Sequence, residues 1–211
     1  MSRGVVRRRR AARRPTPARE PTRGPTTVMR TFSKLLLTIG LIMTLTESAQ
    51  AGDPENTLIM ELEHGTVVIE MLPDVAPKHV ARIKELTREG FYDGVVFHRV
   101  MDGFMAQTGD PTGTGTGGSG QNIDAEFSSV PFERGTVGMA RAQNPNSGDS
   151  QFFIMFADGS FLNGQYTVWG RVVEGMEAVD QIKKAPAGRQ SGMVDDPDRV
   201  VSMKVQADTA Q

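Results

Sequence analysis

The chain has 211 residues, no cysteine and three histidines, and its 24 basic and 25 acidic residues nearly cancel. The lack of cysteine excludes a disulfide framework, thiol catalysis and cysteine metal ligands. The three histidines are too far apart in the sequence to form a metal-binding motif, so we expect no metal and no cofactor.

The first 51 residues differ in composition from the rest of the chain. Residues 1–28 are rich in arginine and proline, whereas residues 29–51 combine a basic start, the apolar run LLLTIGLIMTL and an A-x-A ending. This order is typical of a secretory signal peptide, and the run is shorter than the roughly 20 residues that span a bilayer. We predict a signal peptide at 29–51, cleaved after Ala51, and a basic disordered extension at 1–28. Because Met29 also opens a complete signal, the extension is consistent with a start codon assigned too early.

The arginines alone would also fit an organelle transit peptide or a nucleic-acid-binding tail, but neither explains the apolar run. Cleavage after Ala51 would leave 13 basic and 23 acidic residues, a net charge of about −10. A protein of this charge is poorly suited to phosphate backbones, so we expect no nucleic-acid partner. We expect a periplasmic or secreted monomer that is not inserted in a membrane once the signal is removed.

The segment after residue 51 begins with a hairpin pattern. Apolar residues alternate on both sides of Gly65, which predicts two antiparallel strands over residues 56–72. A helix is predicted over residues 76–90, with Pro77 in its first turn and Gly90 at its end. The apolar stripe of this helix consists of Ala76, Val80, Ile83 and Leu86.

Glycine-rich and polar connections separate six further strand-like runs, which are VVFHRV, FMAQTG, TVGMAR, QFFIMF, TVWGRVV and VVSMKV. The segment GMEAVDQIKK predicts a second helix, and APAGRQSGMVDDPD predicts an irregular loop before the last strand. Many short strands with two helices indicate a mainly β protein, either an antiparallel barrel or a sandwich.

Several possible catalytic or binding motifs are not supported by the residues around them. Residues 113–118, GTGTGG, match the pattern G-x-G-x-x-G, but a polar segment with a proline follows where a dinucleotide site needs a helix. His98 and Arg99 would face opposite sides of a strand, and for His98 a structural role with satisfied hydrogen bonds is favoured over a catalytic one. The serines and carboxylates form no hydrolase or glycosidase pattern.

Arg99, Gln107 and Gln151 place polar groups among apolar residues and would need partners if buried. At these residues the chain resembles the cyclophilins, a family of peptidyl-prolyl cis-trans isomerases. The resemblance covers nearly all of residues 56–206 and runs through APKHV, FHRVMDGFMAQTGD, GTGTGG, GTVGMARA, NSGDSQFFI and FLNGQYTVWGRVVEGM. The family implies a closed eight-stranded antiparallel barrel capped by two α-helices, formed here by a single domain over residues 52–211.

The resemblance also implies the site. It makes Arg99 the catalytic residue and gives Gln107 the role of orienting Arg99 or holding the peptide. It implies a proline-ring pocket and further peptide contacts formed by Phe104, Met105, Phe153, Leu162, Ala140, Arg141, Gln151, Phe161 and Tyr166.

Three of these positions depart from the best-known eukaryotic members. Phe161 stands where those proteins have tryptophan, Tyr166 where they have histidine, and Arg141 where they have asparagine. The first two changes resemble bacterial periplasmic members of the family. Phe161 lacks the indole N–H of tryptophan, so we expect weak cyclosporin binding.

Isomerisation of an X–Pro bond crosses a barrier of roughly 18–20 kcal/mol without breaking a bond, so no nucleophile, metal or cofactor is required. A donor from Arg99 aimed at the prolyl nitrogen would bind the twisted transition state more strongly than the planar ground state. We therefore predict an isomerase that acts on X–Pro bonds of exported proteins as they fold. A proline-peptide-binding module is the alternative, and it would not accelerate exchange in the bound peptide. A nucleotide-linked enzyme would need a measurable nucleotide affinity.

Overall fold

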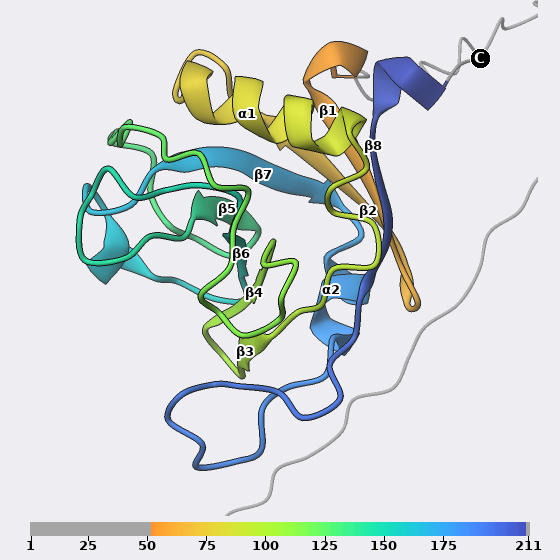
Figure 1. Ribbon diagram of the computed structural model, residues 1–211, viewed down its shortest axis with the longest axis vertical. Helices are drawn as coiled ribbons and strands as arrows, with labels where there is room; N and C mark the ends of the chain where they lie inside the picture. The colour runs from red at the N-terminus through yellow and green to blue at the C-terminus, as the bar shows by residue number, and fades with distance from the viewer. Residues whose placement is uncertain (1–51, 210–211) are drawn as a thin grey trace, which may run out of the picture. The chain divides into compact units, whose positions relative to one another are not determined.

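The computed structural model describes residues 52–209, so the predicted extension and signal peptide lie outside the described residues. Eight strands form one antiparallel sheet in the order β3-β4-β6-β5-β7-β2-β1-β8 (Figure 1). The strands are β1 (Thr57–Leu62), β2 (Gly65–Met71), β3 (Arg99–Met101), β4 (Met105–Thr108), β5 (Thr136–Met139), β6 (Phe152–Met155), β7 (Val168–Glu174) and β8 (Val200–Val205). The mainly β class and the first hairpin are confirmed.

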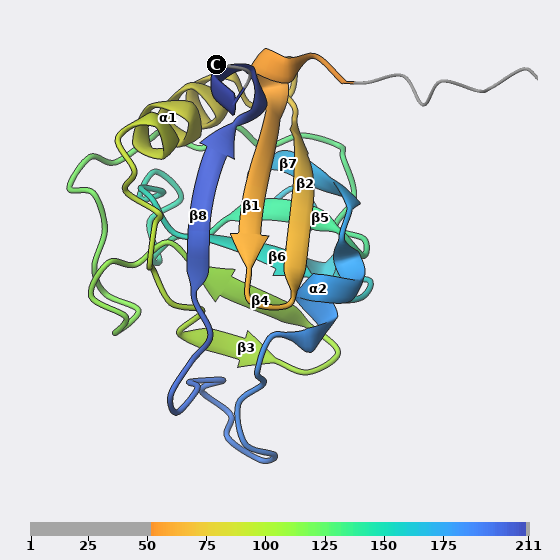
Figure 2. The same cartoon turned by 90° about the vertical axis from the view of Figure 1, so that its right-hand side faces the viewer.

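The sheet is curled and open, so the closed barrel is not confirmed. β8, β1 and β2 lie side by side (Figure 2), and β3 forms the opposite edge of the sheet. The segments that precede β3 and β8 are joined by an isolated bridge between Val96 and Arg199. The outer edge of β3 is occupied by the loop that precedes β8, where the Val100 N–H donates to the Gly192 carbonyl (2.8 Å). A continuous ladder between β3 and β8 is therefore blocked.

Two α-helices are confirmed, α1 (Pro77–Arg88) and α2 (Met176–Gln181), and α2 is shorter than its sequence pattern suggested. Three short 3₁₀ helices cover Pro54–Asn56, Ser160–Leu162 and Gln206–Thr209. Pro77 occupies the first turn of α1, where its missing N–H costs no helical hydrogen bond. No helix within residues 52–209 is long and apolar enough to cross a bilayer.

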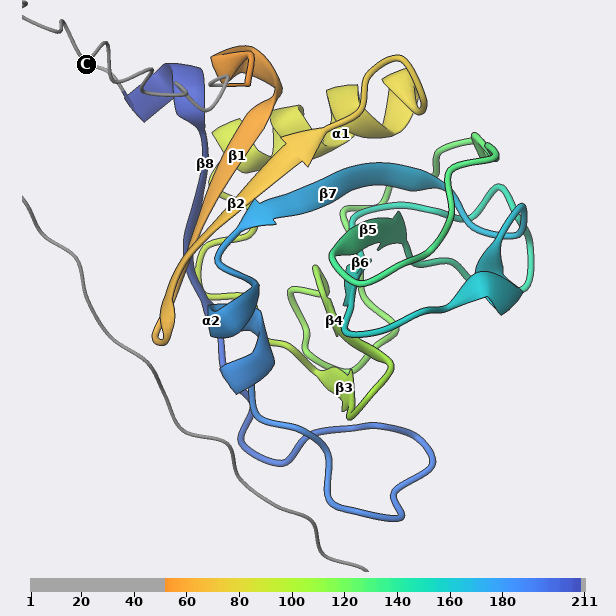
Figure 3. The ribbon, with the colours of Figure 1, turned by 180° about the vertical axis from the view of Figure 1, so that it is seen from behind.

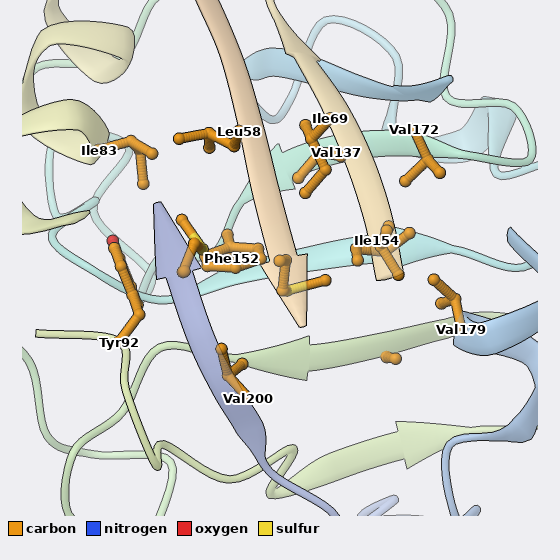
Figure 4. Close-up of a cluster of buried hydrophobic side chains, with 14 of the residues drawn as sticks. Leu58, Ile69, Ile83, Tyr92, Val137, Phe152, Ile154, Val172, Val179 and Val200 are labelled. Atoms are coloured by element: carbon orange, nitrogen blue, oxygen red, sulfur yellow. The ribbon is translucent and has the colours of Figure 1, made fainter. Parts of the chain in front are cut away.

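The main core lies against the concave face of the sheet. Figure 4 shows Leu58, Ile69 and Phe152 pointing into it from three strands, with Ile83 of α1 and Val179 of α2 entering from the two ends. All five side chains are fully buried. The core thus uses one face of each strand and the apolar stripe of each helix.

A second apolar cluster, here called the outer cluster, lies on the other face of β4, β5 and β6. Figure 3 shows these strands from behind. Successive residues of a strand face opposite sides, so Phe152 and Ile154 join the main core while Phe153 and Met155 join the outer cluster. The outer cluster consists of Met105, Phe132, Phe153, Met155, Leu162 and Val168. Because both faces of these strands are packed, side chains on the outer face are held firmly.

Candidate active site

A pocket of about 260 Å³ opens over the outer cluster. Its walls come from β3, β4, β6, the residues just after β5, and the short helix at Ser160–Leu162 with the turn that follows it. Ten of the eleven residues that the sequence singled out line it: Arg99, Phe104, Met105, Gln107, Ala140, Arg141, Phe153, Phe161, Leu162 and Tyr166. Strands distant in the sequence therefore bring the predicted residues together.

The floor of the pocket is apolar. Met105, Phe153 and Leu162 belong to the outer cluster, and each side chain is at least nine-tenths buried. At the rim, the rings of Phe104 and Phe161 lie 5.5 Å apart between centroids, and Phe161 is 63% exposed. An exposed aromatic ring beside a buried apolar floor is a surface suited to an apolar ring from a ligand.

The guanidinium of Arg99 is half-buried at one side of this floor. It donates from Nε to the Ser191 carbonyl (3.0 Å), from Nη1 to Gln107 Oε1 (3.2 Å) and from Nη2 to Met101 Sδ (3.1 Å). Within residues 52–209 it has no carboxylate partner. Burial lowers its pKa from the usual 12.5, and Tyr166 opposes this change. The group still carries its charge at neutral pH.

A polar relay extends from Arg99 away from the pocket. Gln107 Nε2 donates to Gln151 Oε1 (2.9 Å), and Gln151 Nε2 donates to the carbonyls of Gly115 (3.1 Å) and Gly117 (2.8 Å). Arginine can only donate and a carbonyl can only accept, so the two ends fix the orientation of both amides. Gln107 must therefore present its oxygen to Arg99.

The glycine-rich segment at the end of this relay is built around Asp110, which is fully buried. Its carboxylate accepts from the backbone N–H groups of Thr112 (2.7 Å), Gly115 (2.6 Å) and Gly117 (3.1 Å). Burial alone would raise the pKa of Asp110, but these hydrogen bonds outweigh it and hold the pKa at about 2. The N–H groups that a phosphate would need are thus occupied by a carboxylate of the chain itself.

Gln151 lines a second pocket, of about 450 Å³, which shares Gln107, Ala140 and Arg141 with the first. Arg141 lies between the two pockets, with its guanidinium 4.5 Å from the centre of the Tyr166 ring. It also donates to the carbonyl of Gln165 from Nε (3.2 Å) and Nη2 (2.9 Å). These contacts hold the Arg141 side chain against the rim of the first pocket.

Other residues near the site were not identified from the sequence. Ser191, Gly192 and Met101 surround the Arg99 side chain, although the loop that carries the first two has no sequence pattern that indicates a site. His98 is buried, but the satisfied hydrogen bonding expected for it is not found, because neither ring nitrogen makes a hydrogen bond of good geometry with residues 52–209. In the same part of the chain, no group of three or more metal-ligating side chains is arranged to hold an ion.

Comparison with known proteins gives a consistent result. The family model "Cyclophilin type peptidyl-prolyl cis-trans isomerase/CLD" matches residues 57–205. A probable peptidyl-prolyl cis-trans isomerase of Brucella suis is 56% identical over 185 residues, which cover 82% of this chain and 92% of that protein. A peptidyl-prolyl cis-trans isomerase of Synechococcus elongatus is 40% identical over 152 residues, covering 72% and 97% of the two chains.

Two solved structures share the fold. The cyclophilin AquaCyp293 from Hirschia baltica matches with a TM-score of 0.67 at 30% identity, covering 74% of this chain and 76% of that one. A cyclophilin-type isomerase from Cryptosporidium parvum, crystallised in the presence of the dipeptide Ala-Pro, matches with a TM-score of 0.64 at 28% identity, covering 71% and 98%. The chain therefore belongs to the cyclophilin-type peptidyl-prolyl cis-trans isomerases.

Proposed function

We propose that the chain accelerates X–Pro isomerisation in exported proteins, with Arg99 donating a hydrogen bond to the prolyl nitrogen in the twisted transition state. The observation that carries this proposal is the setting of Arg99. Its charged group lies half-buried beside an apolar pocket, and no carboxylate of the described chain neutralises it. A charge is costly in such a place unless a bound group gains from it.

The chemistry follows from amide resonance. In the planar ground state the nitrogen lone pair is delocalised, whereas in the twisted state it becomes a better acceptor. A donor aimed at this nitrogen therefore binds the transition state more strongly. The contacts of Arg99 with Met101 and Met105 are to sulfur, a weak acceptor, so they can be exchanged for the prolyl nitrogen at little cost.

The rest of the pocket supports the binding of a proline-containing peptide. Met105, Phe153 and Leu162 offer an apolar floor for the ring, and the ring of Phe161 covers the rim. The Cryptosporidium parvum relative was crystallised in the presence of Ala-Pro, a ligand of the same chemical class. In this proposal the second pocket, beside Ala140 and Arg141, binds peptide residues that flank the proline.

The proposed clients are exported proteins because of the first 51 residues. Their basic start, short apolar run and A-x-A ending favour a secretory signal cleaved after Ala51. Slow X–Pro isomerisation can limit the folding of such clients. N-terminal sequencing of the protein from cells tests this part: a mature chain that begins at Gly52 is expected, and a cytoplasmic chain that retains residues 29–51 would contradict export.

The activity is tested with a protease-coupled assay on an X–Pro peptide. Arg99→Ala is expected to lower kcat/KM roughly 10²-fold or more, the loss that follows removal of one preorganised donor from a transition state. Arg171→Ala is the matched control, because Arg171 is an exposed arginine on β7 that does not line either pocket. The control is expected to keep full activity, and an active Arg99→Ala variant would contradict the proposed role.

A binding module that holds proline peptides without catalysis would use the same apolar pocket. The two functions differ in the bound peptide, since only an isomerase accelerates its cis/trans exchange. The position of Arg99 favours the enzyme, because an apolar ring can be held without a charge.

A further inference from the structure

The loop between α2 and β8 runs along the outer edge of β3 (Figures 1 and 2). Two backbone hydrogen bonds join it to Val100, one donated to the Gly192 carbonyl (2.8 Å) and one accepted from Ala185 (3.0 Å). The Val194 N–H donates to the His98 carbonyl (3.0 Å). β3 has only three residues and one partner strand, β4, so the loop supplies the contacts that hold its free edge.

The same loop reaches the Arg99 side chain. The Ser191 carbonyl accepts from Arg99 Nε (3.0 Å), while Gln107 Oε1 accepts from Nη1 (3.2 Å). The guanidinium is rigid and planar, so hydrogen bonds from two of its nitrogens to two separate acceptors fix its rotation as well as its position. Gln107 alone would leave the guanidinium free to turn about one hydrogen bond.

Gly192 allows this close approach. Its φ is +72°, and a Cβ at this position would lie 2.6 Å from Met101 Cγ and 3.1 Å from Arg99 Cγ. Any larger residue would therefore press on both side chains and on the contact between Met101 Sδ and Arg99 Nη2. The packing between Gly192 and the Arg99 side chain therefore leaves no room for even one added methyl group.

We propose that the turn at Ser191 and Gly192 is a positioning element that aims the Arg99 guanidinium at the substrate. This inference rests on the proposed function, because it assigns the turn a role in the same reaction. The turn lies outside the residues that line the two pockets. It therefore affects the rate through Arg99 and leaves the apolar floor of the pocket unchanged.

Gly192→Ala tests the proposal. A misplacement of about 1 Å at a reacting group can cost 10²-fold in rate, so we expect kcat to fall tenfold or more. KM and the peptide Kd are expected to stay within twofold, because the apolar floor is intact.

Gly188→Ala is the matched control in the same loop. Gly188 has a similar φ of +83°, but a Cβ there would meet nothing within 4 Å. Both substitutions strain the backbone, and Gly192→Ala also presses on Met101 and Arg99, so its midpoint of thermal unfolding is expected to fall further. Turnover of the two variants is therefore compared at a temperature below both midpoints. Only Gly192→Ala should lose turnover, and equal activity of the two variants would overturn the proposal.

A double-mutant cycle separates an effect on Arg99 from general damage to the site. Combined with Arg99→Ala, the Gly192→Ala change is expected to cause no further loss, because the group it displaces is gone. A further tenfold loss in that background would show that the turn acts on the pocket instead, and would also overturn the proposal.

NMR of the Arg99 Nε–H group gives a readout independent of turnover. Its signal is expected to move in Gly192→Ala and to stay in place in Gly188→Ala. Inactive wild-type protein would refute the proposed function itself. Active wild-type protein, with Gly192→Ala as active as Gly188→Ala, would refute the positioning role alone.

Discussion

At the scale of single residues, the site consists of one charge held by neutral acceptors. Arg99 donates to a backbone carbonyl, an amide oxygen and a thioether, and to no carboxylate of the described chain. A carboxylate would hold the guanidinium more tightly and compete with the substrate for its donors. Neutral partners orient the group and leave its charge available.

Phe161 offers a test of specificity at the rim of the pocket. Phe161→Trp is expected to strengthen cyclosporin binding at least tenfold, because the indole supplies an N–H donor that phenylalanine lacks. The change should be tolerated, since the side chain is 63% exposed. Isothermal titration with cyclosporin measures the effect, and turnover of an X–Pro peptide serves as the control. If the variant binds cyclosporin no more tightly than the wild type, the missing indole N–H is not the cause of weak binding.

The resemblance to the cyclophilins linked site residues from distant segments, such as Arg99 and Tyr166, and only part of the site also stood out as a local pattern. Arg99, Phe104, Met105 and Gln107 fall within one short segment, where polar residues in an apolar run stand out. The partner of Arg99 at Ser191 is 92 positions away, in a loop without periodicity, so no local pattern could reveal it. The lack of a well-aligned partner for His98 within residues 52–209 was equally hidden, because hydrogen bonding depends on residues that only the fold brings together.

At the scale of elements, the glycine-rich loop after β4 is the least expected feature. It matches the dinucleotide pattern G-x-G-x-x-G, yet its N–H groups surround Asp110. A Cβ at Gly117 would overlap Asp110 Oδ1, so glycine is needed for this approach. The loop then presents its carbonyls to Gln151, and through Gln107 it supports Arg99.

Asp110→Asn is expected to lower the free energy of unfolding by about 2 kcal/mol at pH 7, the value of a pKa shift from 3.8 to about 2. The folded-state pKa is depressed, so this stabilisation is present above pH 3.8 and is lost as the pH falls toward 2. Urea unfolding measures it, with the exposed Asp102→Asn as the control. If Asp110→Asn were still about 2 kcal/mol less stable than the wild type at pH 2, the stabilisation would not come from the charged Asp110 carboxylate.

The helices and strands themselves were well predicted, because hydrophobic periodicity is local. The apolar stripe of α1 is buried as expected, and each strand-like run overlaps one strand. Closure of the barrel was not confirmed, since it depends on which segment pairs with the short strand β3. The loop before β8 takes that edge, through Gly192 and Ala185.

At the scale of the whole molecule, burial of histidine links stability to pH. His79 and His98 are each 1% exposed, and burial lowers the pKa of both from 6.5, although Glu126 raises that of His79 and Asp110 that of His98. Below pH 6.5 the unfolded chain takes up protons that the folded chain does not. Stability is therefore full above pH 6.5 and falls as the pH decreases.

His98→Phe is expected to flatten this dependence. Each buried histidine contributes up to about 1.4 kcal/mol per pH unit below its unfolded pKa, and phenylalanine does not titrate. Urea unfolding of the wild type and the variant between pH 7.5 and 5.5 measures the two slopes. Parallel slopes would show that His98 takes up its proton in the folded protein as readily as in the unfolded chain.

The most direct test of the central claim is cis/trans exchange in a bound X–Pro peptide, measured by NMR at saturating protein. Wild type and Arg99→Ala are expected to bind the peptide with Kd values within a few-fold, because the apolar floor is unchanged. The exchange rate of the bound peptide should fall roughly 10²-fold or more in the variant. Equal exchange rates in the two proteins would contradict the role of Arg99, and slow exchange in both would show a binding module.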